Sequence, residues 1–154
     1  MTQHIRRFLP LCAFALLWGV SLALPAVRVR GGPVFDGADL LLRGWQGAAR
    51  GILAWYANPL FAAALALAAL RRDVAAAVLS LLALALALTS FALEPLLELG
   101  MASVPDIGFL PGLYVWLSAL AAAAVWSSLR APWGGRGPET AREERGIDRP
   151  QGSP

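Results

Sequence analysis

The residues that could do chemistry are few, and the clearest candidates interrupt a long apolar stretch. Asn58 and Pro59 fall inside the apolar run 52–70, and Asn58 is the most polar side chain in any such run. Proline removes a backbone donor and kinks a helix, and an amide in apolar surroundings seeks a hydrogen bond from a neighbouring helix. The pair therefore predicts a helix kinked near Tyr56 and Ala57 and joined to a neighbour through Asn58. A ligand or ion site at a broken helix is the alternative.

The rest of the inventory argues against an enzyme. His4 is the only histidine, Cys12 is the only cysteine, and the chain has no lysine. A bis-histidine haem site, a Ser–Lys dyad and an internal disulfide are therefore excluded. Small four-span multidrug exporters rely on a glutamate in their first span, and the first apolar run here has no acidic residue. We expect no catalytic residue, no cofactor and no metal.

The elements that position these residues follow from hydrophobicity. Of 154 residues, 58% are hydrophobic and only 15% are charged, compared with about 25% charged in a typical soluble domain. Four runs lack Lys, Arg, Asp and Glu, and each approaches the roughly 20 residues that span a bilayer; these runs are 8–27, 52–70, 74–93 and 109–129. A soluble bundle would need a polar stripe, which 74–93 and 115–126 lack. The fold class predicted is all-α, an integral membrane four-helix bundle, with a transmembrane domain at 1–130 and a disordered cytoplasmic tail at 131–154.

The distribution of arginine predicts the orientation. Two arginines precede the first run, two lie in the turn 71–73 and five follow the fourth run, whereas the loop 28–50 has four and 94–108 has none. By the positive-inside rule, both termini are cytoplasmic in a multi-pass protein of the bacterial cytoplasmic (inner) membrane. In the alternative, residues 1–26 are a signal peptide cleaved after Ala23 or Ala26, which leaves three spans.

The short turn 71–73 predicts a tight antiparallel hairpin of the second and third spans, in which Asp73 caps the third. In the loop 28–50, apolar residues recur at helical spacing from Asp39 onward. Two interpretations remain open: a separate short helix in the membrane interface, or an outward extension of the second helix beyond Gly51.

The two outer loops carry opposite charges. The second loop contains Glu94 and Glu98, four residues apart, and no basic residue. Our hypothesis is that Arg43 or Arg50 pairs with one of these glutamates and closes the outer surface of the bundle. The alternative is that the two loops are solvated independently.

Three segments carry a resemblance to known proteins: "LLLRGW" in the first outer loop, "AWYANP" at the start of the second span and "GLYVWLSAL" in the fourth. Over roughly residues 8–130 the chain resembles uncharacterised small bacterial inner-membrane proteins with four spans. That resemblance implies no activity.

The function predicted is a non-enzymatic structural or partner-binding subunit. Its partners would be the lipid bilayer and a membrane-protein partner or a second copy, with no nucleic acid. Ala-rich faces of the later spans, and Gly19 with Ala23 in the first, would let helices approach closely. The alternative is a transporter or binder of a small or lipidic ligand near Asn58.

Overall fold

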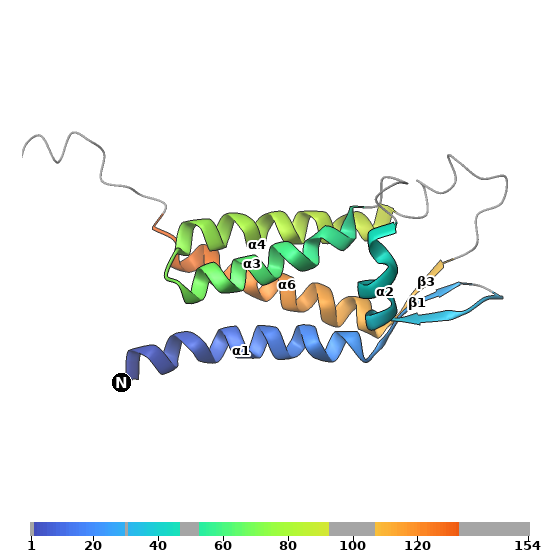
Figure 1. Cartoon of the computed structure of the whole chain (residues 1–154), viewed down its shortest axis with the longest axis horizontal. Helices are drawn as coiled ribbons and strands as arrows, with labels where there is room; N and C mark the ends of the chain where they lie inside the picture. Colours follow the sequence, from blue (N-terminus) through green and yellow to red (C-terminus); the bar gives the residue numbers. More distant parts are fainter. Residues whose placement is uncertain (1, 30, 47–52, 93–106, 133–154) are drawn as a thin grey trace, which may run out of the picture.

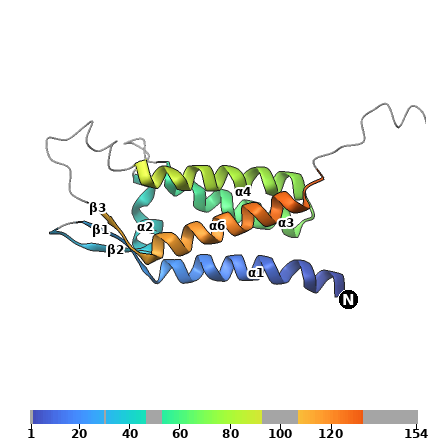
Figure 2. The ribbon, with the colours of Figure 1, turned by 180° about the vertical axis from the view of Figure 1, so that it is seen from behind.

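Four long helices lie side by side, and a small sheet and a short helix gather at one end of them (Figures 1 and 2). The computed structural model describes residues 2–29, 31–46, 53–92 and 107–132. Its helices and strands, in chain order, are α1 Thr2–Leu22, β1 Pro25–Val29, β2 Val34–Asp36, α2 Gly37–Arg43, the 3-10 helix η2 Ala54–Tyr56, α3 Ala57–Ala69, α4 Asp73–Leu88, the 3-10 helix η3 Thr89–Ala92, β3 Ile107–Phe109 and α6 Pro111–Arg130. The chain is mostly helical, as expected, and it also contains a small three-stranded sheet that the predicted all-α class does not include.

Helix α6 lies at the centre of the bundle, in contact with α1 on one side and with α4 on the other, and α4 packs in turn against α3 (Figure 1). Small side chains dominate the core between α3, α4 and α6, where the buried residues are Ala57, Phe61, Ala83, Ala87, Leu120 and Ala123. Alanine lets helix backbones approach closely. Part of the Ala-rich faces is therefore buried inside this chain, while other alanines such as Ala62 and Ala66 of α3 stay exposed.

The helix boundaries differ from the apolar runs at two places. Helix α1 ends at Leu22, five residues before the end of the run 8–27, because the residue before Pro25 is disfavoured in helical conformation. Residues from Pro25 onward enter β1. In the second run, a 3-10 turn precedes α3, which starts at Ala57.

The sheet has the strand order β2-β1-β3, with both pairs antiparallel. Val27 of β1 lies opposite Phe35 on one side and Phe109 on the other. Gly31, with φ of 71°, supplies the left-handed residue of the turn between β1 and β2. The sheet thus joins the segment after α1 to the segment before α6, and we call this end of the bundle the sheet end (Figure 2).

The opposite end of the bundle, the turn end, is closed by the α3–α4 connection. The Arg72 N–H donates to the Leu67 carbonyl at 2.9 Å, and Arg71 between them is left-handed with φ of 62°; this is a Schellman motif. From α1, Arg7 donates to the Ala68 carbonyl through Nε at 3.0 Å and Nη2 at 2.7 Å. Arg7 also pairs with the Asp73 carboxylate.

Asp73 therefore has a different role from the one predicted. It is the first residue of α4, the N-cap position is Arg72, and the Asp73 carboxylate holds α1. Two other predictions lie outside the described residues: the charge pairing that involves Arg50, Glu94 and Glu98, and the disordered tail beyond residue 132.

Candidate functional site

Asn58 joins three helices at the sheet end. Its side-chain oxygen accepts one hydrogen bond from the Trp18 indole of α1 and one from the Trp116 indole of α6, both at 3.0 Å. Its amide group donates to the Trp55 carbonyl of η2 at 3.2 Å. An amide oxygen has two lone pairs, so both are used here. Asn58 thus makes the interhelical contact that an amide needs in apolar surroundings.

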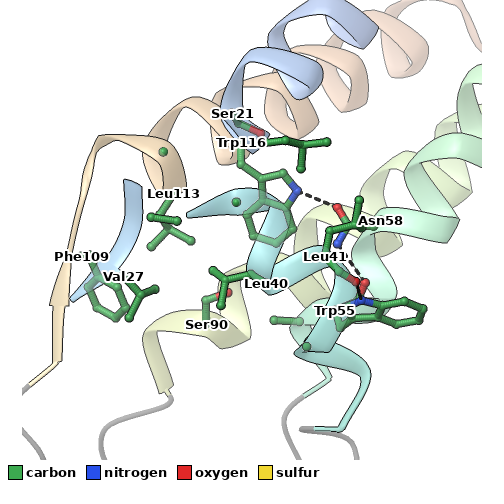
Figure 3. Close-up of a pocket in the computed structure, with 16 residues that line it drawn as sticks. Ser21, Val27, Leu40, Leu41, Trp55, Asn58, Ser90, Phe109, Leu113 and Trp116 are labelled. Atoms are coloured by element: carbon green, nitrogen blue, oxygen red, sulfur yellow. Dashed lines mark hydrogen bonds between the residues drawn. The ribbon is translucent and has the colours of Figure 1, made fainter. Parts of the chain in front are cut away.

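The hydrogen bonds continue from Asn58 to α2. The Trp55 indole donates to the Leu41 carbonyl at 2.7 Å, which satisfies one of the carbonyls that the last turn of a helix leaves without an internal partner. One chain of hydrogen bonds therefore links helices α1, α6, α3 and α2. Its side chains are those of Trp18, Trp116, Asn58 and Trp55. We call these four residues the Asn–Trp network; Figure 3 shows three of them, Asn58, Trp55 and Trp116.

Pro59 lies within the first turn of α3, because Tyr56 is the N-cap and Ala57 is the first helical residue. The expected kink within a continuous helix is replaced by a helix start preceded by the 3-10 turn η2. The first turn of a helix has N–H groups without intrahelical acceptors, so a proline there removes no helical hydrogen bond.

A cavity of about 150 Å³ adjoins the Asn–Trp network (Figure 3). It is lined by residues of α1, the sheet, α2, η2, α3, η3 and α6: Ser21, Leu22, Ala26, Val27, Gly37, Leu40, Leu41, Gly44, Ala54, Trp55, Asn58, Ser90, Phe109, Gly112, Leu113 and Trp116. None of these side chains carries a charge. Most are half-buried rather than buried, so the cavity reaches the surface of the protein.

The polar side chains of the cavity differ in whether they have a hydrogen-bond partner. Ser21 donates to the Trp18 carbonyl at 2.6 Å, and Asn58 is engaged as described above. The Ser90 hydroxyl, by contrast, makes no hydrogen bond to any residue that the structure describes. Figure 3 places Ser90 across the cavity from Trp116, beside Leu40. Ser90 is therefore a polar group of the cavity that is open to an added molecule.

Helix α2 covers one side of this cavity and depends on a glycine to do so. A Cβ at Gly37 would lie 2.4 Å from the Ser21 carbonyl oxygen and 2.7 Å from the Leu22 Cα. Only glycine permits this approach of α2 to the end of α1. The Asp36 carboxylate accepts from the Asp39 N–H at 2.8 Å and caps α2 at the same point. For the loop 28–50 the sequence left two interpretations open, and the structure shows the separate short helix, α2.

The structure brings together only part of the predicted site. Asn58 and Pro59 lie at the cavity, and Arg43 is an exposed residue at the end of α2. Sequence reasoning did not connect Trp18 and Trp116 with Asn58. The available signal was chemical: a half-buried indole needs an acceptor, and Asn58 is the one amide within an apolar run.

Comparison of the chain with protein-family models, with curated proteins and with solved structures finds no match. The interpretation of the cavity therefore rests on its own geometry.

Proposed function

We propose that this chain is a four-span protein of the bacterial cytoplasmic membrane, with both termini cytoplasmic, that binds a small and mostly apolar molecule in the cavity at its sheet end. The observation that carries the binding function is the uncharged cavity beside the Asn–Trp network, with the Ser90 hydroxyl unused. Small-molecule sites are typically concave and apolar, with a few polar groups that set orientation. No reaction is proposed.

The membrane location is supported by the surface of the bundle. Two described segments, Asp73–Phe91 and Pro111–Arg130, are long and apolar enough to span a bilayer. Only 33% and 39% of their apolar windows are buried in the protein, so most of that apolar surface faces outward. Soluble monomers rarely expose contiguous apolar surface on this scale.

The other two proposed spans are shorter. Arg7–Leu22 and Ala54–Ala69 fall in the class of 10–17 residues, and at 1.5 Å per residue each covers about 24 Å. A bilayer core of about 30 Å accommodates a short span by local thinning, at a modest cost. Exposed side chains on α1 such as Leu9 and Leu16, at 70% and 69% exposure, are suited to lipid contact.

The contacts of α1 support its retention as a span. Cleavage after Ala23 or Ala26 would remove the ion pair of Arg7 with Asp73 and one of the two indole donors to Asn58. A structural or partner-binding role is the second candidate. That role would depend on small residues that stay exposed, which include Gly19 of α1, Ala23 just after it, and Ala62 and Ala66 of α3.

Orientation is tested by cysteine labelling in intact cells. In a Cys12→Ser background, a cysteine replacing Val34 in β2 should react with a membrane-impermeant maleimide. A cysteine replacing Arg130, at the end of α6, should react only after the membrane is permeabilised. The opposite pattern would contradict the proposed orientation, and labelling of both in intact cells would contradict the three spans proposed between β2 and the end of α6.

Binding is tested by fluorine NMR on protein that contains 5-fluorotryptophan, in phosphatidylcholine nanodiscs. The Trp116 resonance, assigned from a Trp116→Phe spectrum, should shift when n-hexane is added. Ser90→Leu should abolish the shift, because leucine fills the cavity and removes a hydroxyl that has no protein partner. The matched control is Ser118→Leu, which adds the same volume at an exposed position on α6 and should leave the shift unchanged. An unresponsive Trp116 resonance in the unmodified protein would refute the binding function.

A further inference from the structure

The distribution of polar groups around the cavity indicates which part of a ligand goes where. At one end, the Asn–Trp network has its indole donors and its amide oxygen fully occupied, so it offers a ligand a largely apolar wall. At the other side, Ser90 presents a hydroxyl that no described residue uses. Ser90 is half-buried, so a ligand in the cavity can reach its hydroxyl. The Ser90 hydroxyl is therefore a polar position that a ligand can use, in a cavity whose walls are mostly apolar.

The volume sets the size of the apolar part. An apolar cavity of about 150 Å³ accommodates a benzene-sized molecule, which corresponds to about six carbon atoms. The walls opposite Ser90 come from Leu113, Phe109, Val27 and the Trp116 ring (Figure 3). No charged side chain lies among the residues that line this cavity, so a charged group within it would have no partner and would be costly to bury.

We propose that the ligand is a small uncharged amphiphile, with an apolar body of about six carbons and one hydroxyl or carbonyl oxygen that hydrogen-bonds to Ser90. This inference rests on the proposed binding function. Ser90 both donates and accepts through its hydroxyl, so either oxygen type is accommodated. The apolar body lies against Trp116 and Leu113, and the oxygen points toward η3.

The two faces of α2 indicate the route to the cavity. Leu40 and Leu41 line the cavity, whereas Leu42 and Trp45, just beyond them, are 73% and 55% exposed. A short helix with apolar residues on both faces separates the cavity from the membrane interface. No residue of α2 is fully buried, so moving α2 aside breaks the Trp55–Leu41 hydrogen bond and contacts of half-buried side chains only. An amphiphile dissolved in the outer leaflet would enter beside α2.

The hydrogen bond is tested with two probes of equal carbon number, 1-hexanol and n-hexane, titrated against the Trp116 resonance in nanodiscs. The apparent affinity of each probe is compared between the unmodified protein and Ser90→Ala. Because a probe partitions into the bilayer equally in both samples, the ratio of the two affinities does not depend on that partition. A neutral hydrogen bond contributes a factor of roughly two to ten in affinity. Ser90→Ala should therefore weaken hexanol about fivefold and leave hexane unchanged. If hexanol binds the unmodified protein and Ser90→Ala with equal affinity, the proposed hydrogen bond to Ser90 is overturned. A Trp116 shift that hexane still causes in both proteins would leave the binding function standing. If neither probe shifts Trp116, both proposals fail together.

A lipid and a free small molecule could each supply this chemistry, and a competition experiment distinguishes them. Nanodiscs are prepared with and without monooleoylglycerol, an uncharged single-chain lipid with hydroxyl groups. Displacement of hexanol from the unmodified protein by this lipid supports a membrane lipid as the source. Hexanol binding that is unaffected by the lipid supports the same amphiphile chemistry from a free small alcohol.

Discussion

Replacing Asn58 by leucine tests the role of the Asn–Trp network in stability. The change removes two hydrogen bonds of 3.0 Å from the indoles of Trp18 and Trp116 and one of 3.2 Å to the Trp55 carbonyl. Interhelical hydrogen bonds in membrane proteins contribute roughly 0.6 kcal/mol each, and a local bond such as that to Trp55 contributes about 0.5–1.5 kcal/mol, so the three together contribute about 2 kcal/mol. Two indole N–H groups are also left without an acceptor, and an unmade bond costs at least about 1 kcal/mol where the donor is buried. Because both indoles are half-buried, we expect a total loss of about 2–3 kcal/mol.

The assay is the free energy of unfolding in mixed micelles, measured by titration with sodium dodecyl sulfate. The control is Ser118→Leu, an exposed position on α6, which should change the free energy by less than about 0.5 kcal/mol. A double-mutant cycle that combines Asn58→Leu with Trp18→Phe should give a coupling energy of roughly 0.6–1 kcal/mol. A loss below about 0.5 kcal/mol for Asn58→Leu, or a coupling energy of zero, would refute the network as a stabilising element.

Two further substitutions test contacts at either end of α1. Gly37→Ala should destabilise the protein by about 1–3 kcal/mol, because the new Cβ would overlap the Ser21 carbonyl. It should also weaken hexane binding. The control is Gly19→Ala, where the new Cβ meets no atom within 4 Å and the higher helix propensity of alanine should stabilise the protein by up to about 1 kcal/mol. If the two alanine variants unfold alike, the tight approach of α2 is not required. Arg7→Leu should lower the free energy of unfolding by about 1.5–3 kcal/mol through loss of its charged hydrogen bonds to Asp73 and the α3 terminus. Arg7→Lys should recover part of that loss, since lysine keeps the charge but not the forked geometry; a lysine variant as unstable as the leucine variant would contradict the ion pair.

The apolar runs predict the helices well but not the sheet. Long runs without charge define where α4 and α6 lie, because hydrophobicity over about 20 residues is a strong signal. The strands have only three to five residues each, and β3 pairs with a segment far away in the chain. Pairing of such short, distant segments leaves no periodic pattern in either one, so sequence reasoning placed them in a helix and in loops.

The site was predicted by residue type but not by arrangement. Asn58 stood out because an amide within an apolar run demands a partner, and the structure supplies Trp18 and Trp116. Pro59 was read as a kink because its position within the helix depends on where the helix starts, and local sequence locates helix ends poorly. Ser90 gave no signal, since a serine near the end of an apolar run is ordinary. Its importance comes from what the tertiary structure leaves unbonded around it.

The order of the sheet has a consequence for biosynthesis. A chain made from its N-terminus presents α1 and β1 early, and α3 and α4 can pair as a hairpin of adjacent segments as soon as both have emerged. Strand β3 and α6 come last, yet α6 is the helix that contacts both α1 and α4, and β3 is the strand that completes the sheet. Until α6 has been made, α1 lacks most of its packing surface. The cavity is therefore the last feature to form, and a chain that stops before β3 would hold the α3–α4 hairpin without the complete cavity.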